Sequence, residues 1–387
     1  MLKYFICVGS GKMVYLDYSA TTQTNDEVLE SFLKASKKYI GNPNSLHKLG
    51  IESNNIIEKA SIQIADLLKV KPNEIIYTSG SSESNNLAIK GICQKYSNRG
   101  KHIITTSLEH SSIYGPINYL IDNGYKVDFV KLDSNGLVDL NDLEKLITDE
   151  TILVTINAVN SEIGIKQPIE KIAKIVKKYP KCFFHSDMTQ AIGKVDVDLT
   201  DIDLVSFSAH KFYGIKGIGV LIKNEKIEIE PLIHGGKSTT SYRSGTPTLP
   251  LIISISKALR LALENLNNKY NHVNELNKYL KDSLSKYEKV KINSNDLCIP
   301  HMLNISVLGV KPETLLHALE EHEIYISTQS ACSVSNAVSK AVLALTNDQE
   351  RAKSSVRISL SNLTTKEEIN YFLEKFDIVY NKLTNLR

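Results

Sequence analysis

The sequence of 387 residues predicts an α/β fold, a mostly parallel central sheet covered by helices, together with a smaller α+β domain. Short apolar runs alternate with helical patterns from about residue 70 to residue 225. Most of these runs are continuously apolar rather than alternating, which is typical of strands buried on both faces of a sheet. The length exceeds that of one typical core and therefore favours one large and one smaller domain.

The expected elements follow one another at short intervals. Strands are expected at 75–77, 103–105, 127–130, 152–156, 182–184, 203–206 and 219–222. Helices are expected between them at 83–90, 111–122, 139–148 and 168–178, and Pro168 suits a first helical turn. Pro247 and Pro250 interrupt the pattern, after which one long amphipathic helix is expected over 251–286 and a last helix near 365–385.

These patterns predict a domain organisation. Residues 13–250 are expected to form the large domain, with their first residues packing with the small domain. Residues 251–387 are expected to form the connecting helix and the small domain. Residues 1–12 are expected to be an N-terminal extension or a misassigned start. Their apolar run is too short for a signal peptide and lacks a convincing cleavage site.

The composition excludes several classes of function. The net charge of +3 is small and the lysines are scattered, so nothing argues for direct binding of nucleic acid. No apolar stretch approaches the roughly 18 residues that would suggest a membrane helix. The five cysteines form no CxxC pair and no metal-ligand spacing, and an odd, scattered set suits a reducing compartment. We therefore expect a cytoplasmic protein without a metal site.

Two residues at the ends of neighbouring apolar runs carry the chemistry. Lys211 lies in Ser208-Ala-His-Lys211, between an apolar run and a glycine-containing turn. Partial desolvation there favours the neutral amine that forms a Schiff base with an aldehyde. Asp187 closes the run 182–184, where a carboxylate faces the crevice in which open α/β sheets bind ligands. Alone, each would more often be a loop, cap or surface residue, but the two together are a much rarer combination.

The motifs around these residues resemble one family over nearly the whole chain, from about residue 13 to the C-terminus. They include Tyr15-Leu-Asp-Tyr-Ser-Ala-Thr-Thr22, Gly41-Asn-Pro-Asn-Ser-Leu-His47, Thr78-Ser-Gly-Ser-Ser-Glu-Ser-Asn-Asn86, Asp187-x-x-Gln190, Arg243-Ser-Gly-Thr246, Ser330-Ala-Cys332 and Arg357-Ile-Ser-Leu360. In order and spacing they resemble the NifS/IscS-like cysteine desulfurases of the class V aminotransferase family. The resemblance implies the PLP-dependent transferase fold type I and pyridoxal 5'-phosphate (PLP) as the cofactor.

The resemblance also implies the cofactor-binding residues. Lys211 would form the Schiff base and Asp187 would pair with the pyridine nitrogen, which keeps the ring electron-withdrawing. Gln190 would bond the phenolic oxygen. The turn at Ser81 and Ser82 would bind the phosphate together with Ser208 and His210, and a helix start suits that task, although a serine-rich helix cap explains the turn equally well. Thr246 would reach the phosphate in a second subunit, so that the active unit would be a homodimer.

The remaining predicted residues concern the reaction. His110 would stack on the cofactor and shuttle protons, a task that suits imidazole. Cys332 lies in a polar stretch, 327–336, and would take the sulfur of L-cysteine as a persulfide while L-alanine is released. Arg357 would hold the substrate carboxylate through a planar fork, and Asn160 would lie near the substrate.

The sequence departs from the family pattern at several positions. Ser161 stands where the family has a second asparagine, which puts the tuning of the cofactor in doubt. The segment Gly235-Gly-Lys-Ser-Thr-Thr240 and Asn362 each stand where the family has an arginine. The cysteine stretch lacks the usual Glu-Pro pair. These departures favour a divergent branch with its own sulfur acceptor.

The sequence therefore predicts a PLP-dependent cysteine desulfurase that passes sulfur to an acceptor protein, either an iron–sulfur scaffold or a tRNA-thiolating enzyme. Two other activities stay open, a selenocysteine lyase and another class V aminotransferase. An aminotransferase has no need of Cys332, and a selenocysteine lyase could work without it. A catalytically weak relative that serves as a binding subunit is disfavoured by the joint presence of Lys211, Asp187, His110, Cys332 and Arg357.

Overall fold

The computed structural model describes residues 13–328 and 338–385, which form two compact units. The large unit comprises Thr21–Ser161 and Ile165–Lys269. The small unit comprises the residues up to Ala20, Glu162–Gly164 and the chain from Tyr270 onward. The predicted N-terminal extension, residues 1–12, lies outside the described residues.

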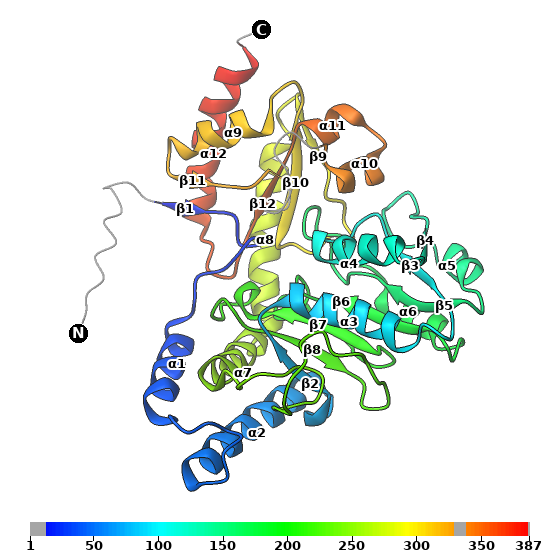
Figure 1. Cartoon of the computed structure of the whole chain (residues 1–387). Helices are drawn as coiled ribbons and strands as arrows, with labels where there is room; N and C mark the ends of the chain where they lie inside the picture. The colour runs from blue at the N-terminus through cyan, green and yellow to red at the C-terminus, as the bar shows by residue number, and fades with distance from the viewer. Residues whose placement is uncertain (1–12, 329–337, 386–387) are drawn as a thin grey trace. The chain divides into compact units, whose positions relative to one another are not determined.

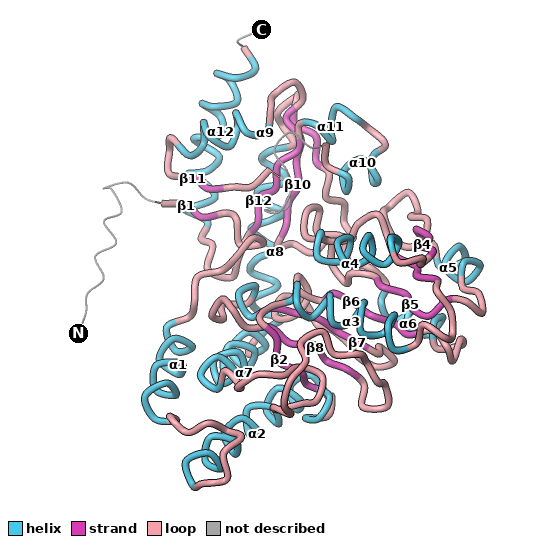
Figure 2. Tube along the Cα trace, viewed as in Figure 1, coloured by secondary structure: helices cyan, strands magenta, loops and turns pink. Residues whose placement is uncertain are grey.

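The large unit is built on a seven-stranded sheet with the order β2-β8-β7-β6-β5-β3-β4 (Figures 1 and 2). Its strands are β2 (Ile75–Thr78), β3 (His102–Thr105), β4 (Lys126–Phe129), β5 (Thr151–Thr155), β6 (Phe183–Asp187), β7 (Leu204–Ser208) and β8 (Gly219–Lys223). Its helices are α1 (Asp26–Lys38), α2 (Lys48–Leu68), α3 (Ser81–Lys95), α4 (Ser111–Asp122), α5 (Leu140–Leu146), α6 (Ile169–Val176) and α7 (Leu249–Leu263). The predicted α/β class with a mostly parallel sheet is confirmed.

One strand of this sheet runs against the others. The neighbours from β4 through β3, β5 and β6 to β7 pair in parallel, whereas β8 is antiparallel to both β7 and β2. In its register Gly219 pairs with Ser208 on one side and with Thr78 on the other. The start of β8 therefore lies at the same sheet edge as the ends of β2 and β7.

Helices cover both faces of the sheet, as continuously apolar strands require. Phe183 of β6 shares a core cluster with Leu87 and Ile92 of α3, which packs across β5 to β8. Successive side chains of a strand alternate between the two faces, so Phe184 faces away from α3, and α6 packs against β6 there. By the same alternation His185 and Asp187 lie on the α3 face.

The predicted single helix over 251–286 is wrong. Helix α7 ends at Leu263 and α8 (Leu266–Leu284) begins three residues later. Asn265 between them has a φ of 53°, in the left-handed region that asparagine tolerates better than most residues. A left-handed residue cannot continue a right-handed helix, and the apolar periodicity on either side gave no sign of it.

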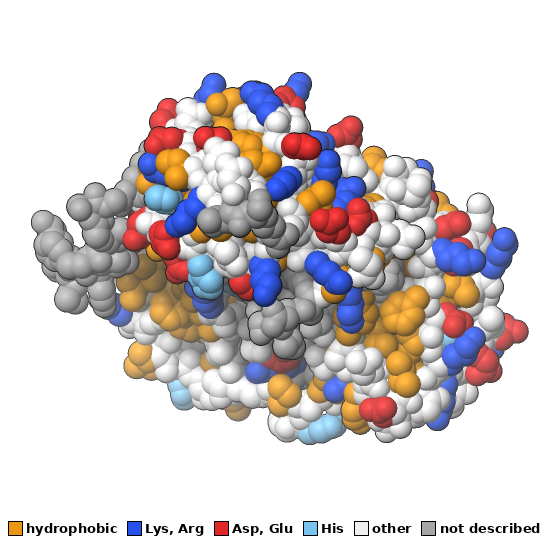
Figure 3. All heavy atoms as spheres, turned by 90° about the horizontal axis from the view of Figure 1, so that it is seen from above, with side chains coloured by type: hydrophobic (Ala, Val, Ile, Leu, Met, Phe, Trp, Pro, Cys, Tyr) orange, Lys and Arg blue, Asp and Glu red, His pale blue; other side chains and the backbone are white. Residues whose placement is uncertain are grey.

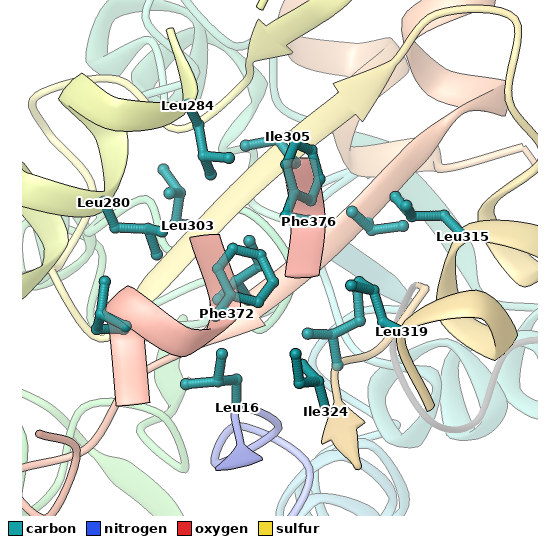
Figure 4. Close-up of a cluster of buried hydrophobic side chains, with 14 of the residues drawn as sticks. Leu16, Leu280, Leu284, Leu303, Ile305, Leu315, Leu319, Ile324, Phe372 and Phe376 are labelled. Carbon is teal, nitrogen blue, oxygen red and sulfur yellow. The ribbon is translucent and has the colours of Figure 1, made fainter. Parts of the chain in front are cut away.

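The small unit is α+β. Its strands are β1 (Val14–Tyr15), β9 (Val290–Ile292), β10 (Met302–Val307), β11 (Ile324–Tyr325) and β12 (Ser355–Ser359). Its helices are α8 from Tyr270 onward, α9 (Pro312–Glu320), α10 (Lys340–Thr346), α11 (Gln349–Lys353) and α12 (Lys366–Thr384). Strand β10 lies between β9 and β12 in an antiparallel sheet, and β1 pairs in parallel with β11. Its core gathers Leu280, Leu303, Ile305, Phe372 and Phe376, which point toward one another in Figure 4.

Basic and acidic side chains alternate over the face of the molecule that Figure 3 shows, in keeping with the small net charge. No helix among residues 13–328 and 338–385 is both long enough and apolar enough to cross a membrane.

Candidate functional site

Two neighbouring parallel strands of the large unit bring Asp187 and Lys211 to one edge of the sheet. Asp187 is the last residue of β6 and pairs in register with Ser206 of β7. Strand β7 ends at Ser208, and a single 3-10 turn, Ala209–Lys211, follows it. Because the carboxyl ends of parallel strands meet at the same edge, the carboxylate and the amine belong to one locality.

The carboxylate of Asp187 is held at both oxygens and is only 7% exposed. Its Oδ1 accepts a hydrogen bond from the backbone N–H of Thr189 at 2.9 Å, and its Oδ2 accepts one from Nδ2 of Asn85 at 2.8 Å. Asn85 is a fully buried residue of α3 that the sequence analysis missed, although it lies within the quoted motif. These bonds fix the orientation of the carboxylate.

The turn before α3 joins two of the residues predicted to hold phosphate. The helix begins at Ser81, two residues earlier than expected, and the backbone N–H of Ser81 donates to Oγ of Ser208 at 2.6 Å. Ser82 is exposed in the same first turn. A Cβ added to Gly219 would lie 2.6 Å from Cα of Gly80, so the approach of β8 to this turn requires glycine.

His210 lies beside this turn as a neutral side chain. Burial, and after it the charges of Lys211, Lys216 and Lys194, lower the pKa of its imidazole to about 4. Its Nδ1 lies 3.2 Å from Oγ1 of Thr21. At neutral pH the ring is therefore a neutral hydrogen-bonding group rather than a cation.

Gln190 follows Asp187 in a buried turn. Its Oε1 accepts a hydrogen bond from Nζ of Lys194, and both side chains are less than 10% exposed. The charge of the buried Lys194 acts on His210, as does that of Lys211. Nothing in the sequence pattern distinguished Lys194 from the many surface lysines.

His110 is the N-cap of α4, and its ring takes part in that cap. Nδ1 accepts from the backbone N–H of Ser112 at 3.1 Å and lies 2.8 Å from Oγ of the same serine. The sequence predicted a helix over 111–122 directly after His110, but it did not predict that His110 caps this helix. The cap fixes the ring at the start of the helix.

The residues just before His110 are fastened to the chain after β5. The carbonyl oxygen of Leu108 accepts from Nδ2 of Asn157 at 2.5 Å and from Nδ2 of Asn160 at 2.8 Å. Glu109 accepts from the backbone N–H of Asn157 and from Oγ1 of Thr106, yet burial outweighs these bonds and raises the pKa of its carboxyl to about 8. Asn160, for which a place near the substrate stays a prediction, thus positions the loop before His110.

Arg357 lies in the small unit, in the middle of β12. It is 1% exposed, and its Nη2 donates to Oδ1 of Asp17 at 2.8 Å. Asp17 belongs to the motif at 15–22, yet the sequence analysis assigned it no role.

Two predicted residues remain, Cys332 and Thr246. Cys332 lies outside the described residues. Thr246 is exposed, and Arg243 of the same motif donates from Nε to Oε1 of Glu83 in α3 at 3.0 Å. A pocket beside this pair is lined by residues of the turn after β2 and of the segment 238–248, among them Thr78, Ser79, Ser238, Thr239, Arg243 and Thr248.

The donor set of the large unit suits pyridoxal phosphate. Asp187 offers an oriented carboxylate to a protonated ring nitrogen, and Lys211 offers an amine to an aldehyde. The backbone and hydroxyls at Ser81 and Ser208, with His210, offer hydrogen bonds to a phosphate at the start of a helix. No residue of the set is a chemical mismatch for the group that it would contact.

Comparisons with known proteins agree with this chemistry. The family model "Aminotransferase class-V" matches residues 14–372. A protein of Dictyoglomus turgidum named cysteine desulfurase IscS is 39% identical over 380 residues, which cover 96% of each chain. A solved structure titled NifS-like protein superposes with a TM-score of 0.91 at 37% identity and covers 96% of this chain and all of that one. A structure titled SspA in complex with cysteine gives a TM-score of 0.79 at 32% identity, over 91% of this chain and all of that chain.

Proposed function

Because the chain belongs to the class-V aminotransferase family, whose members use PLP, we propose that it is a cysteine desulfurase that converts L-cysteine to L-alanine. One observation in this chain carries the proposal: the ends of β6 and β7 bring Asp187 and Lys211 together at one sheet edge, with α3 starting alongside. The similar proteins named above supply the substrate, since one is called a cysteine desulfurase and another was solved with cysteine.

Each residue of the large unit has a task in this function. Lys211 binds the cofactor through its amine, and Asp187 holds the positive ring nitrogen, oriented by Asn85. Ser81, Ser82, Ser208 and His210 bind the phosphate and Gln190 the phenolic oxygen. When bound, the cofactor supplies an electron sink for the cleavage of bonds next to the substrate amine.

Cys332 receives the sulfur. Its thiolate attacks the sulfur of the bound substrate, an S–S bond forms, and the C–S bond breaks. The carbon left behind takes up a proton and leaves as alanine, and His110 moves protons in these steps. Arg357 binds the substrate carboxylate and Asn160 lies near the substrate.

The wider setting is part of the proposal. Thr246 would reach the phosphate in a second copy of the chain, which makes the active form a homodimer. A sulfur-acceptor protein, an iron–sulfur scaffold or a tRNA-thiolating enzyme, takes the persulfide sulfur in the cytoplasm. The division into residues 13–250 and 251–387 stays a prediction.

Anaerobic turnover of L-cysteine tests the function, with a reducing thiol present to release the persulfide sulfur as sulfide, and with alanine, sulfide and the visible spectrum recorded together. We expect a yellow wild type that makes equimolar alanine and sulfide, and a Cys332→Ala variant that stays yellow but makes neither. A Lys211→Ala variant should lose the visible band of the wild type. A yellow wild type that makes no alanine from cysteine would reject the desulfurase and direct attention to selenocysteine and to transamination.

A matched control separates the role of Cys332 from a general need for thiols. Cys298 is half-buried, and burial raises the pKa of its thiol to about 12. Because it carries no thiolate at neutral pH, Cys298→Ala should keep the turnover of the wild type. Equal losses in the two variants would contradict the assignment of Cys332.

A further inference from the structure

A series of hydrogen bonds links Asp187 to His110 through Asn85 and Ser112. Asn85 uses its side-chain nitrogen twice, donating to Oδ2 of Asp187 at 2.8 Å and to Oγ of Ser112 at 2.9 Å. Oγ of Ser112 lies 2.8 Å from Nδ1 of His110. The four residues come from α3, β6 and the start of α4, all within the large unit.

The direction of each bond follows from its partners. The backbone N–H of Ser112 can only donate, and it bonds Nδ1 of His110 at 3.1 Å, so Nδ1 carries no proton. The hydroxyl of Ser112 therefore also donates to Nδ1 and accepts from Asn85. Rotating the amide of Asn85 by half a turn would set its oxygen against the carboxylate of Asp187, which fixes the nitrogen in place.

We propose that Asn85 and Ser112 are positioning residues that join Asp187 and His110 into one hydrogen-bonded unit and hold His110 in the tautomer with its proton on Nε2. The inference rests on the proposed function, in which Asp187 and His110 both contact the cofactor. It gives His110 a defined starting state, an N–H donor at Nε2. For Nε2 to act first as a base, the proton would have to sit on Nδ1, which would break the bond from the backbone N–H of Ser112 and reverse the bond with its hydroxyl.

Burial makes this unit costly to break. Asn85 is fully buried and Asp187 is 7% exposed, so water cannot replace a lost partner of either side chain. A buried polar group that loses its partner keeps the full cost of its desolvation. A substitution at Asn85 should therefore disturb both Asp187, to which it bonds directly, and His110, to which it is linked through Ser112.

The tautomer of His110 can be measured in the holoenzyme by ¹⁵N NMR of the imidazole nitrogens, with His110 assigned by its loss in a His110→Gln variant. We expect a neutral ring at neutral pH, protonated on Nε2. A proton on Nδ1, alone or together with one on Nε2, would overturn the inference. This measurement needs no change at Asn85 and so stands where substitution of that buried residue prevents folding.

A double-mutant cycle tests the coupling, read as the dissociation constant of PLP from the full-length chain. Asn85→Ala should weaken PLP binding about tenfold, because Asp187 loses a charge-assisted hydrogen bond. Asn85→Ala and His110→Ala together should weaken it less than the product of the two single effects, by about threefold or more. In a Ser112→Ala background the two effects should multiply to within about twofold.

Two control variants complete the cycle. Ser112→Thr keeps the hydroxyl and should keep the coupling, whereas Ser111→Ala changes the exposed serine next to it and should leave PLP binding and the coupling as in the wild type. Coupling that survives Ser112→Ala, or effects that multiply in the wild-type background, would reject the inference while the proposed function stands. A wild type that binds no PLP would reject the proposed function itself.

Discussion

Nη2 of Arg357 donates a 2.8 Å hydrogen bond to Oδ1 of Asp17, and the two residues lie on neighbouring segments of the small unit. Asp17 bridges in parallel to Ser359, two residues after Arg357 on β12. The arginine is 1% exposed, whereas the side chain of Asp17 keeps 19% of its surface. A buried guanidinium is thus given a counter-ion that orients its fork before any substrate arrives.

Replacement of Asp17 by alanine should weaken the binding of L-cysteine more than it slows the later steps. The carboxylate holds the fork of Arg357 in place, so its loss affects the group that we propose binds the substrate carboxylate. We expect KM for L-cysteine to rise about tenfold with a smaller change in kcat. The free energy of unfolding should fall by about 2 kcal/mol or more, because a buried charge loses its partner.

Asp296 offers the matched control in the same unit. Its side chain is 97% exposed in an ion pair with Lys281, and exposed pairs contribute little. Asp296→Ala should therefore keep the KM and the stability of the wild type. A Asp17→Ala enzyme with an unchanged KM would contradict the proposed link between Asp17 and Arg357.

Replacement of Gly219 by alanine should weaken cofactor binding, although Gly219 is not itself among the residues predicted to contact the cofactor. The new Cβ would lie within 2.8 Å of backbone atoms of Gly80 and Phe207, none of which can yield without moving the turn before α3. We expect a loss of about 1–3 kcal/mol in the free energy of unfolding and weaker PLP binding, measured by denaturant unfolding and by titration. Gly115 is exposed in α4 with open space around it, so Gly115→Ala should not destabilise the protein and should raise the free energy of unfolding by about 0.5–1 kcal/mol.

The ion pair between Arg243 and Glu83 should govern the affinity for the phosphate of PLP. Glu83 lies in the first turn of α3, where burial opposes its ionisation but hydrogen bonds from Ser79 and Arg243 prevail and hold the pKa of the carboxyl below its ordinary value. Without Arg243 the carboxylate would repel an incoming phosphate. Arg243→Gln should weaken PLP binding about fivefold, an effect of about 1 kcal/mol between partly exposed charges.

A second substitution distinguishes repulsion from simple loss of a positive charge. Adding Glu83→Gln to Arg243→Gln removes the repelling carboxylate and should restore part of the affinity. Pyridoxal, which lacks the phosphate, should show no such recovery. If the double variant binds PLP no better than Arg243→Gln alone, repulsion by Glu83 is not the cause.

His185 should make the protein sensitive to acid. Burial lowers the pKa of its imidazole to about 4, an effect that the nearby charge of Asp187 only partly offsets. The unfolded chain takes up this proton near pH 6.5, so the contribution of His185 is complete above that pH and declines as the pH falls toward 4. In a His185→Gln variant, stability should fall less between pH 7 and pH 5 than in the wild type.

An exposed histidine provides the comparison for this titration. The side chain of His317 keeps 72% of its surface, so His317→Gln should leave the pH dependence of unfolding unchanged. Urea unfolding at several pH values measures both variants. Parallel curves for wild type and His185→Gln would show that another group carries the acid sensitivity.

The sequence predicted most of the fold because buried parallel strands leave a simple signal. Seven apolar runs correspond to the seven strands of the large unit, and the ends shift by at most a few residues. The reversal of β8 was not visible, since an apolar run has no direction. The break at Asn265 was also missed, because one left-handed residue does not disturb the helical periodicity around it.

The sequence singled out the charged and nucleophilic residues of the candidate site. It did not single out the residues that hold these side chains in place. Asp187, Lys211, His110 and Arg357 carry groups whose chemistry can be argued from type and position. Asn85 and Ser112 are common polar residues of a helix start, and only their bonds to partners far along the chain distinguish them. Those partners are set by the packing of α3 against the sheet, which a sequence pattern does not contain.

The antiparallel strand β8 also determines when, during synthesis, the sheet can be completed and the cofactor can bind. Strand β8 lies between β2 and β7. Its pairing with β2 places Ile222 opposite Ile75, and these two residues lie near opposite ends of the sequence that forms the sheet. Pairings between residues so distant are slow to form and come late. A ribosome-bound chain that ends before Gly219 lacks the strand that joins the turn before α3 to the end of β7. Cofactor capture is therefore a late event of biosynthesis, after nearly the whole sheet has left the ribosome.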